Sequence, residues 1–368
     1  MLSIDVVIPS YRLQSEYLIP IVQMDIPPEA AVRFLVIADN PNVEIPRDFE
    51  KLLDGKKIIL FRNKENRGVC KARNFGIDNS KADWILFIDD DVKPEKALLL
   101  KYVEAIKANP EETGFFGEVI FPPPSNLFTK GISASVILTF FTIGQRVDHL
   151  KWAPTPNVMI KRSVIGKTRF DDKFDKFGAS EEIDFFLKIY RSKGKELFVV
   201  KDAKVYHDWW NNGKRNYNRF MRWAGGFTLL IAAFPEYSFY NYPNLIESLV
   251  VGLPVFAVAS VYFHAPIFLI CFLLGVILGE CSVEFLTLWA TKGFAQGRFA
   301  IESALIRASM DIGKFKTQVK YHKIATHFCR RFDHFCDGKR IDRMRLIAAV
   351  KCFTYVLFPV ILYYLVSK

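Results

Sequence analysis

The sequence predicts an α/β domain with a largely parallel sheet, followed by apolar helices that associate with a membrane. Short apolar runs alternate with helical patterns through roughly the first hundred residues, which is the order of strands and crossover helices in a parallel sheet. One of these runs ends in three consecutive carboxylates, Asp89, Asp90 and Asp91. The second half of the chain is more apolar, with an almost uncharged stretch over residues 245–278.

The composition agrees with this division. The chain has 368 residues, enough for one large domain with an appendage or for two domains. Its hydrophobic content of 51% is high for a soluble protein. Its formal net charge of +11 suits anionic lipid, phosphorylated ligands or nucleic acid and does not choose among them. The six cysteines form no CxxC pair, as expected of reduced thiols in a cytosol-facing protein.

Five apolar runs are the candidate strands of the α/β domain. They cover residues 4–9, 32–38, 57–61, 84–88 and 197–206. Helical periodicity over residues 69–79 precedes the fourth run, and Pro94 after the aspartates predicts that another helix opens there. The middle of the chain, residues 114–210, is less regular. The sequence contains no GxGxxG or Walker A motif, which disfavours an ordinary dinucleotide-binding fold or a P-loop enzyme.

The three aspartates indicate either a cation site or a solvated acidic turn. Like charges held together repel one another, so a fold keeps them for a reason. Magnesium prefers oxygen ligands and is usually shared between one or two carboxylates and the phosphates of a substrate. The carboxyl end of a strand is also where open α/β sheets bind ligands. These three residues alone leave both interpretations open.

Three segments of the second half are candidate membrane spans: residues 246–263, 266–280 and 346–366. A break at His264, Ala265 and Pro266 suggests that the first two form a helical hairpin. Lysine and arginine are concentrated in residues 291–345, which the positive-inside rule places in the cytoplasm. We therefore expect a multi-pass membrane protein whose N-terminal domain faces the cytoplasm.

A basic stretch with interleaved aromatic residues, 214–223, precedes these spans. It suits single-stranded nucleic acid or an amphipathic helix on anionic lipid. The apolar run that follows favours lipid, so no nucleic-acid partner is expected.

Polar residues collect at the ends of the predicted strands. They are Ser10, Tyr11, Asp39, Asn66, Arg73, Asp89, Asp90, Asp91, Glu181, Glu182 and His207. Ser180 is a plausible N-cap, which would place the two glutamates in the first turn of a helix, near the positive end of its dipole.

With these motifs in this order, the chain resembles the inverting glycosyltransferases of family 2, which have the GT-A fold, a Rossmann-like mixed sheet. The similar segments are residues 6–11 (VVIPSY), 66–76 (NRGVCKARNFG), 87–91 (FIDDD), 170–184 and 219–223 (RFMRW). The resemblance covers roughly residues 3–225. It implies a catalytic domain over residues 1–225 and a membrane-associated region over residues 226–368.

The resemblance also implies a nucleotide-sugar site with a divalent metal. The residues implied to bind the nucleotide sugar are Pro9, Ser10, Tyr11, Asp39, Arg73, Asp89 and Asp90. Asp91, with Asp89 and His207, would hold Mg²⁺ or Mn²⁺. Three alternatives stay open: Asp39 as a turn former, Arg73 on a solvated helix face and His207 as an ordinary hydrogen-bonded residue.

For catalysis, the resemblance places Glu182 at the general base. The family usually has Asp there, so the extra methylene of Glu182 leaves Glu181 as an alternative base. Arg222 would add positive charge near the departing diphosphate.

The expected function is that of a metal-dependent inverting glycosyltransferase. It would move a sugar from a nucleotide-sugar donor, most often a UDP-sugar in this family, to a lipid-linked or glycan acceptor at the membrane. One alternative is a small processive polysaccharide synthase, suggested by residues 219–223. Another is a catalytically inactive membrane scaffold that binds sugar nucleotides, suggested by Glu182 in place of Asp.

Overall fold

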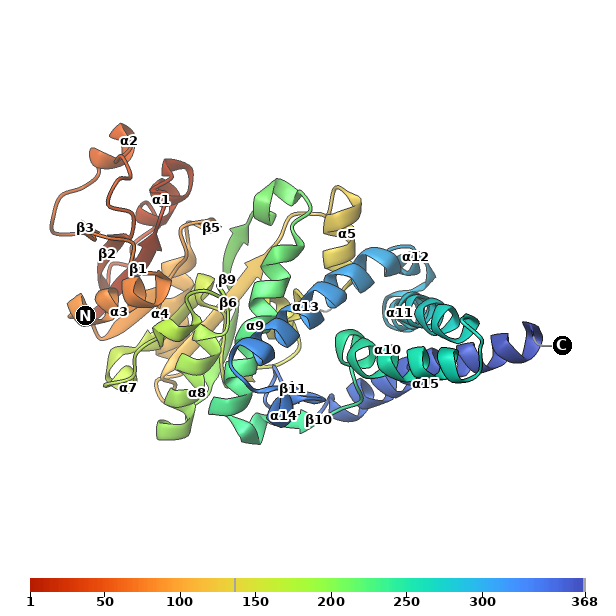
Figure 1. Cartoon of the computed structure of the whole chain (residues 1–368). Coiled ribbons are helices and arrows are strands. Elements are labelled where there is room, and N and C mark those ends of the chain that lie inside the picture. The colour runs from red at the N-terminus through yellow and green to blue at the C-terminus, as the bar shows by residue number, and fades with distance from the viewer. Residues whose placement is uncertain (136, 367–368) are drawn as a thin grey trace. The chain divides into compact units, whose positions relative to one another are not determined.

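The computed structural model describes residues 1–135 and 137–366, which fold into two compact units (Figure 1). The N-terminal unit comprises Met1–Pro123 and Leu138–Asn212. The C-terminal unit comprises Pro124–Ile137 and Gly213–Lys368. A short segment from the middle of the chain therefore belongs to the C-terminal unit.

A mixed sheet organises the N-terminal unit. Among the described residues it has nine strands, in the order β3-β2-β1-β4-β8-β6-β9-β5, with β7 paired to β9. The strands are β1 (Leu2–Ser10), β2 (Ala30–Ala38), β3 (Ile58–Arg62), β4 (Trp84–Phe87), β5 (Val92–Pro94), β6 (Gly114–Ile120), β7 (His149–Leu150), β8 (Val158–Lys161) and β9 (Leu197–His207). The first four in chain order are parallel, as the sequence predicts, whereas β8 is antiparallel to both of its neighbours.

Helices cover the sheet of this unit. They are α1 (Ser15–Val22), α2 (Arg47–Glu50), α3 (Val69–Asn79), α4 (Leu98–Ala108), α6 (Thr139–Thr142), α7 (Arg162–Ile165) and α8 (Glu181–Lys193), with 3₁₀ turns at η1 (Ile143–Gln145), η2 (Thr155–Asn157) and η3 (Asp172–Phe174). Helix α3 packs on β1 and β2, and α4 packs on β9. The central strands are buried along their length, with Val6, Ile8 and Leu86 fully inaccessible. Burial of both faces explains why these strands are continuous apolar runs.

The structure corrects two local predictions in this unit. Pro94 does not open a helix, because Val92–Pro94 forms β5 and pairs with the end of β9, so that α4 begins only at Leu98. Helix α8 begins at Glu181 as predicted, but Ser180 does not cap it with its side chain. Ser180 has a φ of 85°, a left-handed conformation that is uncommon for residues other than glycine.

The C-terminal unit is mainly helical. Its elements are α5 (Leu127–Ala134), η4 (Trp210–Gly213, which contains the junction), α9 (Tyr217–Ala233), η5 (Pro235–Tyr237), β10 (Ser238–Tyr240), α10 (Leu245–Tyr262), α11 (Ile267–Lys292), α12 (Phe294–Gly297), α13 (Ala300–Lys320), α14 (Ile324–His327), β11 (Arg330–Phe332) and α15 (Ile341–Val366). Helix α13 packs against α9, α5, α10 and α11, and α11 packs against α10 and α15. The strands β10 and β11 form an antiparallel pair.

In the described part of the chain, three helices are long and apolar enough to cross a membrane: Leu245–Tyr262, Ile267–Lys292 and Ile341–Leu365. They occupy the three apolar stretches of the sequence. The predicted break at residues 264–266 lies between α10 and α11. Helix α11 continues to Lys292, beyond the expected end of the second span at residue 280.

Candidate active site

The aspartates that follow β4 lie beside the end of β1. These two strands pair in parallel, with Val7 opposite Phe87, so their carboxyl ends meet at one edge of the sheet. The Ser10 hydroxyl donates a hydrogen bond to Asp90 Oδ2 at 2.6 Å and accepts one from the backbone N–H of Leu13. Burial raises the pKa of Asp90 to about 6, although the Ser10 hydrogen bond opposes this. Asp90 is thus held against β1.

Arg73 connects this edge to the first turn of α8. The Arg73 side chain comes from α3 and is 4% exposed. It donates from Nη2 to Asp89 Oδ1 at 2.9 Å and from Nη1 to Glu181 Oε1 at 3.0 Å. Its guanidinium also lies over the ring of Phe170, with Cζ 5.5 Å from the ring centre. One buried cation therefore joins two carboxylates that stand far apart in the sequence.

The two first-turn glutamates have different environments. Glu181 is 4% exposed and is paired with Arg73. Glu182 has no such ion pair within the described residues, whereas a buried Oε2 without a hydrogen-bond partner there is common to both glutamates. Burial raises the pKa of Glu182 well above the usual value, and the neighbouring negative charge of Glu181 raises it further. Glu182 is therefore the glutamate of the two that is not engaged by the Arg73 guanidinium.

Asp91, directly before β5, and His207, at the end of β9, face each other where these two strands pair. His207 Nε2 lies 3.5 Å from Asp91 Oδ1, while His207 Nδ1 lies 2.5 Å from the carbonyl oxygen of Asp208. A proton on Nδ1 satisfies that carbonyl and leaves the lone pair of Nε2 directed toward the carboxylate. The imidazole ring is held by stacking on Phe121, with ring centres 5.0 Å apart.

Asp91 and His207 can supply two of the ligands that a divalent cation needs. Carboxylate oxygen and imidazole nitrogen are suitable ligands for Mn²⁺ or Mg²⁺, which commonly take the remainder from substrate phosphates and water. Throughout the described residues, no three His, Cys, Asp or Glu side chains lie close enough together to hold a metal. Asp89, the third predicted ligand, instead uses its Oδ1 to accept a hydrogen bond from Nη2 of Arg73. Asp91 and His207 are the two residues that would hold the ion.

Asp39 follows β2 and holds the loop that leads into α3. Its Oδ1 accepts hydrogen bonds from Asn63 Nδ2 at 2.6 Å and from the backbone N–H of Arg67, and its Oδ2 accepts one from the backbone N–H of Gly68. Asp39 is 5% exposed. In this arrangement it acts as a turn-stabilising residue, and its predicted contact with the nucleotide stays a prediction.

The remaining predicted residues divide between the two units. Pro9 is buried at the end of β1, and the adjacent Tyr11 is 53% exposed. Arg222 lies on α9 of the C-terminal unit, where it is exposed. A cavity of about 550 Å³ is lined by residues 164–169 and by Lys188, Ser192 and Lys193 of α8, and no predicted site residue lines it.

Two residues at this edge were not predicted. Arg12 Nη2 lies 3.8 Å from Asp90 and 3.7 Å from Asp91, with the Arg12 side chain half exposed. Its position directly after the predicted residues Ser10 and Tyr11 was a usable signal. Asp175 accepts a hydrogen bond from the backbone N–H of Cys70 at the start of α3, a contact that no local pattern indicates.

Comparison with known proteins assigns the chain to a protein family. Residues 5–168 match the glycosyl transferase family 2 profile. An uncharacterized glycosyltransferase of Haemophilus influenzae is 30% identical over 216 residues, which cover 55% of this chain and 67% of that protein. The chain belongs to glycosyltransferase family 2. Together with the mixed sheet, this gives the N-terminal unit a GT-A fold, and the protein is a glycosyltransferase.

Two further likenesses are more distant. The glucosyl-dolichyl phosphate glucuronosyltransferase of Haloferax volcanii is 23% identical over 184 residues, 48% of this chain and 59% of that protein. The match thus spans little more than half of that relative. The crystal structure of S. aureus TarS 1-349 aligns with 88% of this chain and 92% of its own, at 12% identity and a TM-score of 0.45, and carries no functional argument.

Proposed function

We propose that this glycosyltransferase inverts the anomeric carbon of a nucleotide-activated sugar, with Glu182 as the general base. The observation that carries the proposal is the buried Arg73, which pairs with Glu181 and Asp89 and leaves Glu182 outside these ion pairs, with its pKa raised well above the usual value by burial. A carboxylate whose pKa lies nearer the working pH is the better general base. Glu181 is instead engaged by the Arg73 guanidinium at 3.0 Å.

In the proposed reaction, the acceptor hydroxyl gives its proton to the Glu182 carboxylate. The acceptor oxygen forms a bond to the anomeric carbon while the bond from that carbon to the diphosphate oxygen breaks, and its electron pair leaves with the nucleoside diphosphate. A Mg²⁺ or Mn²⁺ ion at Asp91 and His207 would neutralise charge on the departing diphosphate. Arg12, beside the same carboxylates and half exposed, is placed to contribute positive charge there as well.

The donor is proposed to be a UDP-sugar. Its nucleotide would lie along the carboxyl ends of β1 and β2, near Pro9, Ser10, Tyr11 and Asp39, which is where open α/β sheets bind nucleotides. The position of Ser10 against Asp90 makes this edge continuous with the aspartates that follow β4.

The acceptor is proposed to be lipid-linked, and the protein to be membrane-attached with its catalytic unit in the cytoplasm. Three helices of sufficient length and apolar character support attachment. The basic residues between the second and third of them support a cytoplasmic side. A relative named for a dolichyl phosphate substrate supports a lipid acceptor.

The proposal is tested by nucleoside diphosphate release from the full chain in a mild detergent. A panel of nucleotide sugars is supplied with Mn²⁺ and a membrane lipid extract as acceptor, with and without EDTA. We expect release with one donor, loss of release with EDTA, and retention of donor binding but not transfer in Glu182→Gln. Transfer by Glu182→Gln at the native rate refutes the role of that residue, and absence of release with every donor refutes the proposed activity.

A further inference from the structure

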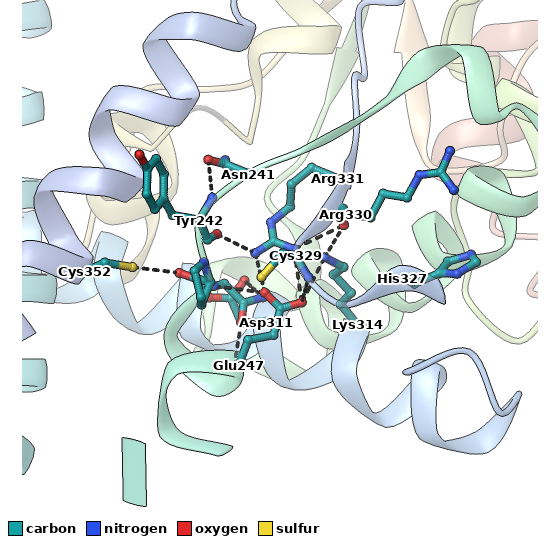
Figure 2. A network of polar contacts seen from close by, with 12 residues as sticks. Asn241, Tyr242, Glu247, Asp311, Lys314, His327, Cys329, Arg330, Arg331 and Cys352 are labelled. Carbon is teal, nitrogen blue, oxygen red and sulfur yellow. Dashed lines mark hydrogen bonds and ion pairs between the residues drawn. The ribbon is translucent and has the colours of Figure 1, made fainter. Parts of the chain in front are cut away.

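The basic residues of the C-terminal unit fall into two groups, one internal and one exposed. The internal group surrounds Glu247, in the first turn of α10, which is 1% exposed (Figure 2). Arg331 Nη1 donates to Glu247 Oε1 at 3.1 Å and Lys314 Nζ lies 3.6 Å from the same atom. Arg307 likewise pairs with Glu284 at 3.0 Å. These cations are paired with carboxylates inside the protein and are therefore not available to a partner.

The network around Glu247 also connects the beginning of α10 to the beginning of α15. The backbone N–H of Cys329, next to β11, donates to Glu247 Oε1 at 3.1 Å. Just before α10, the carbonyl oxygen of Tyr240 accepts a hydrogen bond from Arg345 Nε, and that of Pro243 accepts one from Cys352 Sγ. Arg345 and Cys352 both belong to α15. The residues directly before α10 are therefore held against the N-terminal half of α15.

Both helices run in the same direction from this end, because each is antiparallel to α11. Between α11 and α15, Phe268 stacks on Tyr363 and Glu280 pairs with Lys351, so that residue numbers rise on one helix as they fall on the other. Helix α10 forms a hairpin with α11, and Phe256 stacks on Phe272 with ring centres 4.5 Å apart. In a bilayer, α10 and α15 would enter from the same side.

Polar and apolar surface meet at this end. On α15, Leu346 is 65% exposed and Phe353 is also 65% exposed, directly after the basic residues at the helix start. Before α10, Tyr240 is 64% and Tyr242 is 51% exposed. Exposed tyrosines beside apolar helices are typical of the membrane interface. We define the anchoring rim as Tyr240, Tyr242, Lys339, Arg343 and Arg345.

The rim carries a surplus of positive charge. Lys339, Arg343 and Arg345 are exposed, and the side chains of Lys339 and Arg343 have no ion-pair partner among the described residues. The nearby acids are Asp337 and Asp342, of which Asp342 lies 3.5 Å from Arg345. Arg340 stacks its guanidinium on Phe335.

We propose that the anchoring rim lies in the headgroup layer of the membrane and binds anionic phospholipid. The inference rests on the membrane attachment given in the proposed function and adds the lipid class and the residues that select it. Basic residues next to a membrane surface each strengthen binding to anionic lipid about 5-fold. The rim also fixes the level at which α10 and α15 enter the bilayer.

The test measures phospholipid binding to the full chain in a neutral detergent. Native mass spectrometry gives the apparent Kd for phosphatidylglycerol and for phosphatidylcholine. We expect the native chain to prefer phosphatidylglycerol, and Lys339→Gln/Arg343→Gln to weaken that binding about 25-fold while phosphatidylcholine binding is unchanged. The matched control, Lys51→Gln/Lys56→Gln, removes two exposed charges from the N-terminal unit and is expected to bind as the native chain does.

Several results overturn the inference. Equal affinity of the native chain for both lipids overturns it. An equal loss of phosphatidylglycerol binding in the control variant Lys51→Gln/Lys56→Gln also overturns it, because that loss would indicate a net-charge effect. The charge-retaining variant Lys339→Arg/Arg343→Lys should restore binding, and failure to do so also counts against the rim. A chain that stays in solution without detergent would instead refute membrane attachment, whereas nucleoside diphosphate release reports on the proposed reaction alone.

Discussion

Replacement of Arg73 by methionine tests the link between the aspartates after β4 and the glutamates of α8. The Arg73 side chain is 4% exposed, and its carboxylate partners Asp89 and Glu181 are 24% and 6% exposed. Removal of one partner from a buried ion pair costs about 3–5 kcal/mol, because the remaining charges are left uncompensated. For a unit of roughly 200 residues, this corresponds to a fall in Tm of about 6–20 °C.

The fall in Tm of the Arg73→Met variant is expected to depend on pH. Burial already raises the pKa of Asp89, and without the Arg73 guanidinium, which opposes this, the pKa of Asp89 should rise further above its unfolded value. The folded variant then binds more protons than the unfolded chain, so its stability increases as the pH falls. We therefore expect the deficit in Tm to be smaller at pH 5 than at pH 8.

The assay is thermal unfolding of the detergent-solubilised chain, followed by intrinsic fluorescence at both pH values. Lys71→Met is the matched control, because Lys71 stands on the same helix and pairs with Asp172 at 3.0 Å, but both side chains are about half exposed. An exposed pair of this kind is worth about 0–1 kcal/mol. If Arg73→Met melts within about 2 °C of Lys71→Met, the buried bridge is not the element that holds this edge.

Three further results are expected. Transfer by the native enzyme should fall as the pH drops through the raised pKa of Glu182, since the base must be deprotonated, and a pH profile that is flat from 5 to 8 contradicts this. Glu182→Gln should lose about 10²–10⁴-fold in kcat with little change in donor affinity. His207→Ala should raise the Mn²⁺ concentration needed for half-maximal transfer about 10–100-fold, measured by metal titration, whereas an unchanged requirement removes His207 from the ion site. Gly68→Ala should destabilise the N-terminal unit by about 1–3 kcal/mol, because Gly68 has a φ of 88° and an added Cβ would lie 2.3 Å from Asp175 Oδ2; thermal unfolding at the native Tm would show that the loop adapts.

The parallel part of the sheet and the aspartates could be predicted from the sequence because local patterns specify them. The helix predicted over residues 69–79 has those bounds in the structure, and the strand before Asp89 is a continuous apolar run. The strands β6 and β8 were not predicted, since β8 has only four residues and owes its strand structure to pairing with β4. A strand that short has little periodicity to read.

The sequence predicts which residues belong to the candidate site but not which of them contact one another. The resemblance implies that Arg73 lies near the nucleotide, which stays a prediction, and the structure adds its contact with a glutamate 108 positions later. Such a contact depends on how α3 and α8 are packed on the sheet, and no spacing in the sequence encodes it. The left-handed backbone of Ser180 is likewise not predicted from the sequence, because serine is common at N-caps, where its side chain usually accepts a hydrogen bond from the first turn of the helix.

The buried Glu247 has a consequence for the synthesis of the chain. Arg331 lies 84 positions after Glu247, so at about 5–20 residues per second the ribosome makes it roughly 4–17 s later. During that interval the first apolar helix carries an acidic end without the arginine that neutralises it. With the membrane attachment proposed above, stable insertion of α10 is expected to wait for β11, and a nascent chain stalled before residue 331 should be extracted from membranes more readily than one stalled after it.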